Sequence, residues 1–328
     1  MTDQHTHHGN KRLDTSAPTV AASVDTIGDS ASNESPSRGR KVLRGLLRFR
    51  RRMKRYPWLP TLIVVGLLIV PAVFANFLTP HDPLRGVLGD RLTSPFWLEG
   101  GTTEYPLGTD SLGRDILTRV MYGARISLIV GTVTVLFGAI LGSALGMLAG
   151  YLGGWVDKIV TWLIDTFLSL PIVLLALVIV AAIGPSFITI IAIISATIWA
   201  TFARVVRGET LSIREKDYVA RAKVAGVGTF RIILRYILPN LANTLIVMAT
   251  LQVGVVILGE ASLSFIGAGI PRPNPSWGVM VADGRDNVLT AWWLSLFPGL
   301  AILLVVMSLN LMGDWLRDFL DPKLRQQE

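Results

Sequence analysis

Five long stretches of this chain contain no charged side chain. They are Tyr56–Pro80, Ile126–Val156, Thr166–Ala203, Tyr236–Gly259 and Asn287–Gly313. A helix needs about 20 apolar residues to cross a bilayer core of about 30 Å, so the third stretch, with 38 residues, is too long for one helix. Gly184-Pro185 near its middle is a turn signal that divides it. The sequence therefore predicts an all-α polytopic membrane protein with six transmembrane helices.

Basic residues gather beside particular spans and predict the orientation. Ten Lys or Arg and no acid lie between Arg38 and Arg55, and the 204–235 segment has eight against three acids. The 79–125 loop has five Arg against six acids. Positive charge marks the cytoplasmic side, so both termini are expected inside and the 79–125 and 267–289 loops outside. This placement favours membrane topology, with possible contacts to anionic lipid, over nucleic-acid binding.

Composition limits the remaining classes of site. The chain is 51% hydrophobic and 16% charged, and it has no cysteine, which excludes disulfides and thiolate metal sites. Residues 1–40 are polar and are expected to be disordered. A His-rich run there lacks fixed ligand geometry, so no metal site is predicted. We divide the chain into a cytoplasmic tail with a basic juxtamembrane segment, residues 1–55, and a transmembrane domain, residues 56–328.

The polar insert after the fourth span is predicted to hold two short helices. Asp217 can cap the first helix, whose Tyr218, Ala222 and Ala225 share a face. Gly226 supplies the left-handed residue that ends it. A solvated basic loop would not need this helical order, so we expect an element that docks onto a partner.

The second helix of the insert has its own signals. Thr229 can cap it, and Pro239 is expected to break the chain before the next span. Its expected apolar stripe consists of Phe230, Ile233, Leu234 and Ile237.

The insert resembles the EAA loop of ABC importer membrane subunits. Gly226, Leu238 and Pro239 stand at that family's spacing, whereas of the Glu-Ala-Ala triplet only Ala222 agrees. The resemblance implies that residues 204–239 form a cytoplasmic coupling loop, whose helix is seated in a groove of a separate ATPase subunit. The implied coupling residues are Asp217, Tyr218, Ala220, Arg221, Ala222, Lys223 and Gly226.

The first outer loop carries a dense motif, YPLGTDSLGRDILTRVMYGARISL, over Tyr105–Leu128. Thr109 or Asp110 can cap a helix that Gly123 ends, and its pattern predicts an amphipathic helix on the outer membrane surface. The motif lacks the Lys-Ser/Thr of a phosphate loop. No such loop occurs elsewhere in the sequence, so any ATP is hydrolysed by another chain.

This motif resembles the C-type membrane subunit of peptide and nickel ABC importers. The same family pattern occurs in LGEASLSFIGAG, PSWG and LMGD, beginning at Leu258, Pro275 and Leu311, and in Leu316–Pro322. The resemblance runs from about Tyr56 to the C-terminus and implies the type I importer permease fold in a prokaryotic plasma membrane. It also implies a heterodimer with a second permease, two ATPase subunits or one fused, and an extracytoplasmic binding protein. ATP and Mg would be bound by the ATPases, with no cofactor and no catalytic residue in this chain.

Small and acidic residues inside the spans complete the set of candidates. Gly138, Gly142, Gly146 and Gly150 form a small-residue face that allows close helix packing, either static or sliding, and we favour static. A charge at the bilayer centre costs roughly 2.5–3.5 kcal/mol, so acids in the spans should not face lipid. The candidates for the translocation path are Asp165, Glu260, Ser262 and Ser264. The two acids could equally cap or pair within the bundle, and we favour this structural role for both, with Glu260 the better path candidate because it precedes the Ser262–Ser264 polar patch.

The spans contain no His or Cys that could bind nickel, which favours uptake of oligopeptides or dipeptides. Nickel chelates and glutathione are carried by importers with the same motifs and stay open. A stand-alone secondary transporter would usually show inverted repeats, and we find no convincing repeat between the two halves. A membrane scaffold would need nothing organised outside, whereas the outer loop has a helical pattern.

Overall fold

The computed structural model describes residues 56–320, which are mostly helical. Within this range the only bridge between extended segments joins Thr109 and Asp115. The predictions for the 1–55 tail lie outside the described residues. In chain order the helices are α2 (Trp58–Ile63), α3 (Val70–Leu78), α4 (Ile116–Leu152), α5 (Gly154–Ser169), α6 (Ile172–Ile183), α7 (Phe187–Arg214), α8 (Asp217–Val224), α9 (Thr229–Ile232), α10 (Leu238–Phe265), α11 (Trp277–Gly284) and α12 (Trp293–Leu320).

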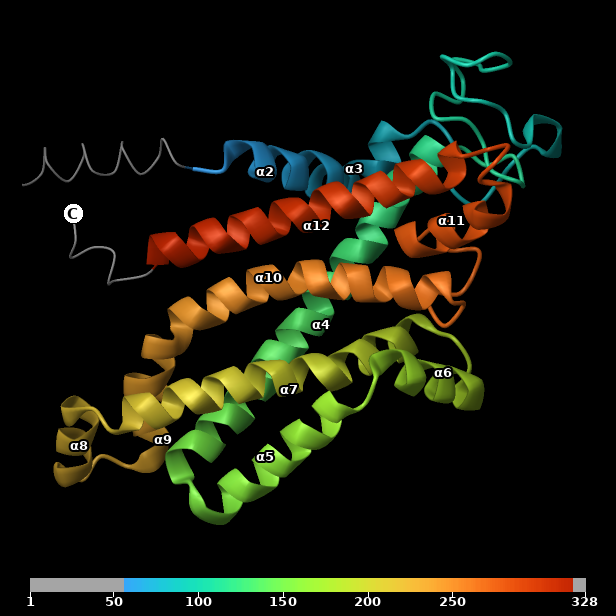
Figure 1. Ribbon diagram of the computed structural model, residues 1–328. Coiled ribbons are helices and arrows are strands. Elements are labelled where there is room, and N and C mark those ends of the chain that lie inside the picture. Colours follow the sequence, from blue (N-terminus) through green and yellow to red (C-terminus); the bar gives the residue numbers. More distant parts are fainter. Residues whose placement is uncertain (1–55, 321–328) are drawn as a thin grey trace, which may run out of the picture. The chain divides into compact units, whose positions relative to one another are not determined.

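The helices α7, α10 and α12 run side by side between two ends of the molecule, and α4 crosses them at an angle (Figure 1). We call the end that carries α8 the α8 end, and the end that carries the 79–115 loop the loop end. Five continuous helical segments are long and apolar enough to cross a membrane: 58–78, 116–152, 187–214, 229–265 and 293–320. The helices α5 and α6 make a sixth crossing when they are counted together, although they bend by 84°. With that pair as one span, the six predicted spans are confirmed.

The glycine turns decide where the middle spans begin and end. Gly184 has a φ of 83° and separates α6 from α7, as its position before proline predicted. The second span ends earlier than expected, because Gly153 and Gly154 both take positive φ, 68° and 57°, and turn the chain into α5. The bend at Leu170-Pro171, between α5 and α6, was not foreseen.

Two predicted helix boundaries were wrong. The expected outer surface helix is the first part of α4, which continues through Gly123 without interruption to Leu152. Gly123 is instead a contact site, since a Cβ there would lie 2.6 Å from the ring of the fully buried Trp277. Pro239 does not break the chain either. A π-helical turn over Ile233–Ile237 precedes it and already departs from regular α-helical bonding, so the missing N–H is tolerated.

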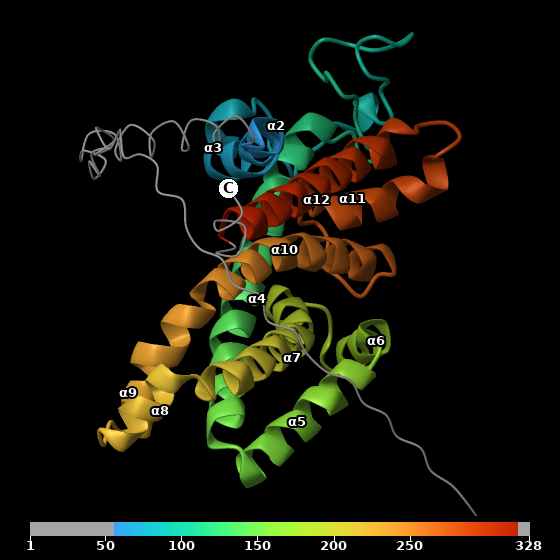
Figure 2. The same ribbon diagram turned by 60° about the vertical axis from the view of Figure 1, so that its left-hand side comes forward.

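The glycine face of α4 packs against α7 along its whole length. A Cβ added to Gly138, Gly142, Gly146 or Gly150 would lie 2.3–2.9 Å from backbone or side-chain atoms of α7. The turned view in Figure 2 shows α4 crossing behind α7 and α10. Helices this close have no room for larger side chains, so the predicted small-residue packing face is present, while the choice between a static and a sliding interface stays a prediction.

Candidate functional sites

The helix α8 begins at Asp217, and Lys216 is the residue that precedes its first turn. Asp217 therefore does not cap the helix through its side chain, contrary to the prediction. Its carboxylate lies within the first turn, where negative charge still interacts favourably with the helix dipole. The extended backbone of Lys216, with ψ of 144°, lets the chain enter α8 without a side-chain cap.

Gly226 ends α8 as predicted. Its φ is +76°, the Gly226 N–H donates to the Lys223 carbonyl at 3.0 Å, and the Val227 N–H donates to the Ala222 carbonyl at 3.1 Å. This pair of bonds satisfies carbonyls that the last turn leaves free, and it needs a left-handed residue at position 226. Empty space surrounds the position where a Cβ would stand, so the requirement for glycine comes from the backbone.

The buried face of α8 differs from the predicted stripe. Val219 and Ala222 are the buried residues, whereas Tyr218 is half-buried and Ala225 is exposed. They pack into one apolar cluster with Ile213 and the following helix, and the Lys223 ammonium lies 5.1 Å from the centre of the Tyr151 ring. These contacts fix α8 to the transmembrane helices.

The opposite face of α8 and the start of α9 are open to solvent. Val224 is 91% exposed and Phe230 is 75% exposed, and Ala220 and Arg221 are exposed beside them. A held helix that presents apolar and basic side chains outward is suited to sit in a groove of another protein.

Two details of the second helix also differ from the prediction. Gly228, not Thr229, precedes its first turn, because α9 begins at Thr229 itself. Of the expected apolar stripe, Ile233 and Ile237 are buried, whereas Phe230 and Leu234 are exposed.

Ion pairs tie α5 to α7 near the α8 end. The guanidinium of Arg207 makes a two-pronged contact with Asp157, with Nη2 2.7 Å from Oδ2. Asp165 accepts from Arg204 Nη2 at 2.7 Å, and both of these side chains are more than half exposed. The pairing gives Asp165 a structural partner, while a role in translocation stays a prediction.

The other translocation candidates lie at the far end of α10. Glu260 is 1% exposed, and its Oε1 accepts from the Ser264 hydroxyl at 2.6 Å. Ser264 also accepts from the Ile270 N–H, so the pair fastens the turn that leaves α10. Ser262 is exposed and bonds to its own helix at Leu258. Glu260 and Ser264 therefore meet, whereas Ser262 points elsewhere.

Four charged residues of the Tyr105–Leu128 motif form a buried network at the loop end. Asp110 binds Arg114, with Nε 2.7 Å from Oδ2, and Arg119 lies 3.6 Å from the same oxygen. Asp115 caps α4 by accepting from the backbone N–H groups of Leu117 and Thr118. All of these charged side chains are buried. Sequence reasoning missed this network, although four charged residues at short spacing signal it.

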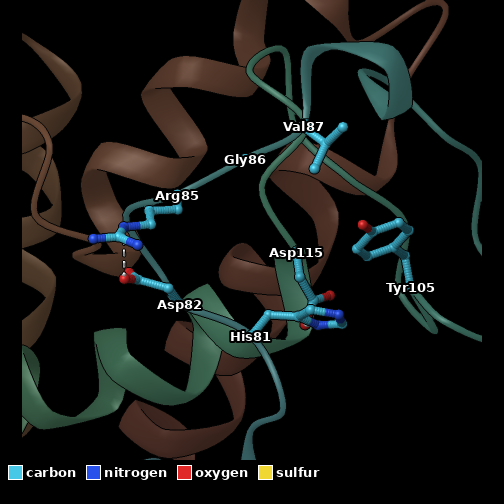
Figure 3. A pocket seen from close by; sticks show the side chains of 8 residues that line it. His81, Asp82, Arg85, Gly86, Val87, Tyr105 and Asp115 are labelled. Carbon is cyan, nitrogen blue, oxygen red and sulfur yellow. Dashed lines mark hydrogen bonds and ion pairs between the residues drawn. The ribbon is translucent and has the colours of Figure 1, made fainter.

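A small cavity of about 200 Å³ lies beside this network (Figure 3). His81 Nδ1 is 3.4 Å from Asp115 Oδ2, and the His81 ring stacks at a tilt on Tyr105 with 5.1 Å between ring centres. Burial raises the pKa of the Tyr105 phenol, and the nearby carboxylates of Glu104 and Asp90 add to this shift. No local pattern pointed to His81, because its partners Tyr105 and Asp115 lie more than 20 residues away in the sequence.

Comparison with known proteins decides the family. A family model described as "binding-protein-dependent transport system inner membrane component" matches residues 142–326, which run from the last third of α4 past the end of α12. The chain belongs to this family. Its members are inner membrane components of transport systems, and the type I importer permease fold is confirmed.

Relatives of the permease agree over most of its length. The di/tripeptide transport system permease protein DppC of Pseudomonas aeruginosa is 42% identical over 264 residues, 80% of this chain and 87% of the relative. The dipeptide transport system permease protein DppC of Escherichia coli K12 is 44% identical over 265 residues, 81% and 88%. The protein of the same name from Alkalihalophilus pseudofirmus is 40% identical over 272 residues, 80% and 86%.

Proposed function

We propose that this permease carries dipeptides or short oligopeptides inward, and that α8 couples it to separate ATPase subunits. The three relatives named above are peptide permeases and match this chain at 40–44% identity. The observation that carries the coupling is the held helix α8, buried at Val219 and open at Val224. In this proposal ATP and Mg²⁺ are bound by the ATPases, and this chain holds no cofactor.

The orientation follows from charge. The segment from Arg204 to Arg235 has eight basic residues against three acids, so the α8 end and both termini are cytoplasmic and the loop end is extracytoplasmic. The ATPases then dock at α8, and a binding protein delivers substrate at the loop end. The folded ion-pair network there supports a role as a rigid platform.

A second permease is expected to complete the path. Helices of the predicted spans carry large apolar side chains that are exposed, such as Phe137 and Ile140 on α4 and Leu174 and Val178 on α6. Some of these face lipid, and a partner permease covers the rest, with the substrate passing between the two.

Coupling then works through a two-state bundle. ATP binding closes the ATPase pair, and the closure moves α8 together with the helices to which it is bound. Because α8 is joined to α7 and α10 by buried contacts, its displacement favours one of two bundle arrangements, open inward or open outward.

Uptake by the assembled importer tests this proposal. The complex is captured through a tag on this chain and reconstituted in vesicles, and labelled dipeptide, glutathione and a nickel chelate are offered with and without ATP. ATP-dependent peptide uptake supports the proposal. Uptake only of glutathione or of the chelate would change the substrate, and uptake without any ATPase subunit would establish a secondary transporter instead.

A further inference from the structure

A cavity of about 780 Å³ lies between α7, α10 and α12 at the α8 end. Figure 1 shows these three helices directed to the same end of the molecule. One wall is apolar, formed by Val247, Met248 and Leu251 of α10. The other parts carry amides from Asn240 and Asn243.

Three charged side chains also line the cavity, one acidic and two basic. Glu209 of α7 is half-buried, and its Oε1 accepts from the Thr244 hydroxyl of α10 at 2.8 Å. Lys216 and Arg317 are exposed at the rim. A carboxylate held by a neighbouring helix and two cations at the rim form a site with one negative and one positive part.

The position of these charges relative to the membrane follows from the charge-free stretches of α7 and α12. The charge-free part of α7 ends at Ala203, so Glu209 lies six residues, about 9 Å, beyond it. The charge-free part of α12 ends at Gly313, which places Arg317 about 6 Å beyond. The cavity therefore joins the apolar interior to the α8 surface.

We infer that this cavity binds the two charged ends of a short peptide as it leaves on the α8 side. The inference rests on the proposed peptide transport and adds a release site to it. Glu209 holds the α-ammonium group, Lys216 or Arg317 holds the α-carboxylate, and the apolar wall holds side chains.

The dimensions suit a short peptide. Glu209 lies five residues, about 7.5 Å along the helix axis, before the end of α7 at Arg214, and Lys216 follows just beyond that end. About two extended residues span this length. A ligand with one charged end would leave one part of the site unpaired, so the site selects free peptides over blocked ones.

Binding of blocked and free peptides tests the assignment. The assembled importer, captured through this chain, is placed without nucleotide in nanodiscs of neutral phosphatidylcholine. Labelled Leu-Leu, its N-acetyl form and its C-terminal amide are then titrated. In the unsubstituted permease, N-acetylation should weaken binding roughly tenfold, as expected for losing a close charge pair.

The variant Glu209→Gln keeps an acceptor for Thr244 but removes the charge. It should weaken binding of free Leu-Leu by about the same roughly tenfold factor, and acetylation should then cause no further loss. Arg317→Gln combined with Lys216→Gln should likewise abolish the effect of C-terminal amidation. Asp318→Asn, next to the cavity on α12, is the matched control and should bind as the unsubstituted chain does.

Two results overturn the inference. One is an acetylation penalty that persists in Glu209→Gln. The other is peptide binding that weakens when phosphatidylglycerol is added to the nanodiscs but does not change when the peptide termini are blocked. That result would make the cavity a lipid site. ATP-driven uptake of Leu-Leu in vesicles is measured in parallel. If uptake is normal and the acetylation penalty in Glu209→Gln is unchanged, only the proposed release site is rejected. If the importer takes up no peptide at all, the proposed peptide transport is rejected.

Discussion

Replacing Gly226 by valine tests whether the order of α8 is required for coupling. A left-handed conformation costs an L-residue roughly 1–2 kcal/mol, and more for a β-branched one. At φ +76° with no atom within 4 Å of the added Cβ, this backbone cost is the whole effect. Because α8 has only eight residues, that cost is enough to unwind its last turn without affecting the spans.

The expected result is a loss of uptake with little loss of ATP hydrolysis. A penalty of about 1–2 kcal/mol shifts a local folding equilibrium about 5- to 30-fold. Uptake per ATP hydrolysed in reconstituted vesicles should fall by a similar factor, while the amount of permease in the membrane stays unchanged. Peptide uptake and phosphate release are measured on the same vesicles.

The chain provides a close control. Gly228 lies two residues away and also has open space at its Cβ position, but its φ is −62° and its ψ 149°, a conformation that valine adopts readily. Gly228→Val should therefore transport normally. Equal defects in the two variants, or normal coupling in Gly226→Val, would refute the argument from backbone geometry.

Three further predictions concern stability. Gly142→Ala places a Cβ 2.3 Å from a backbone oxygen of α7, so the thermal midpoint in detergent should fall by an amount equivalent to roughly 1–3 kcal/mol. Gly299→Ala in α12 has open space at the Cβ and should not lower the midpoint, because alanine favours a helix more than glycine does. An equal midpoint in both variants would contradict the packing. Asp157→Asn should lower the thermal midpoint more than Asp165→Asn, because the Asp157 side chain is 22% exposed and that of Asp165 is 62% exposed. Exposed ion pairs contribute less than about 1 kcal/mol. A larger loss in Asp165→Asn would be inconsistent with this account. Glu260→Gln keeps an acceptor for the Ser264 hydroxyl and should retain the thermal midpoint. Glu260→Ala leaves that hydroxyl without its acceptor and should lower stability by about 1–3 kcal/mol. Similar losses in both variants would show that the charge itself is needed.

The membrane-spanning architecture could be predicted because it depends on local composition. Length, absence of charge and the Gly184 turn are properties of short stretches, and the structure agrees with them. Gly226 was predictable for the same reason, since its left-handed role depends only on its own helix.

Features that depend on distant contacts could not be predicted. Gly123 has the sequence pattern of a helix end, but it leaves room for Trp277, whose indole N–H donates to the Val120 carbonyl. Pro239 is accommodated by a π-helical turn that has no clear sequence signature. The cavity containing Glu209 requires three helices to meet.

A single cysteine at position 224 tests the central claim most directly. The natural chain has no cysteine, so Val224→Cys creates a unique thiol at a position that is 91% exposed. Leu289→Cys, 99% exposed at the loop end, is its counterpart. A membrane-impermeant maleimide is applied to inside-out vesicles, with the ATPase subunits bound or stripped. The account predicts that position 224 is labelled when they are stripped and protected when they are bound, and that position 289 is not labelled in either case. Equal labelling of position 224 with and without the ATPases would contradict the role of α8.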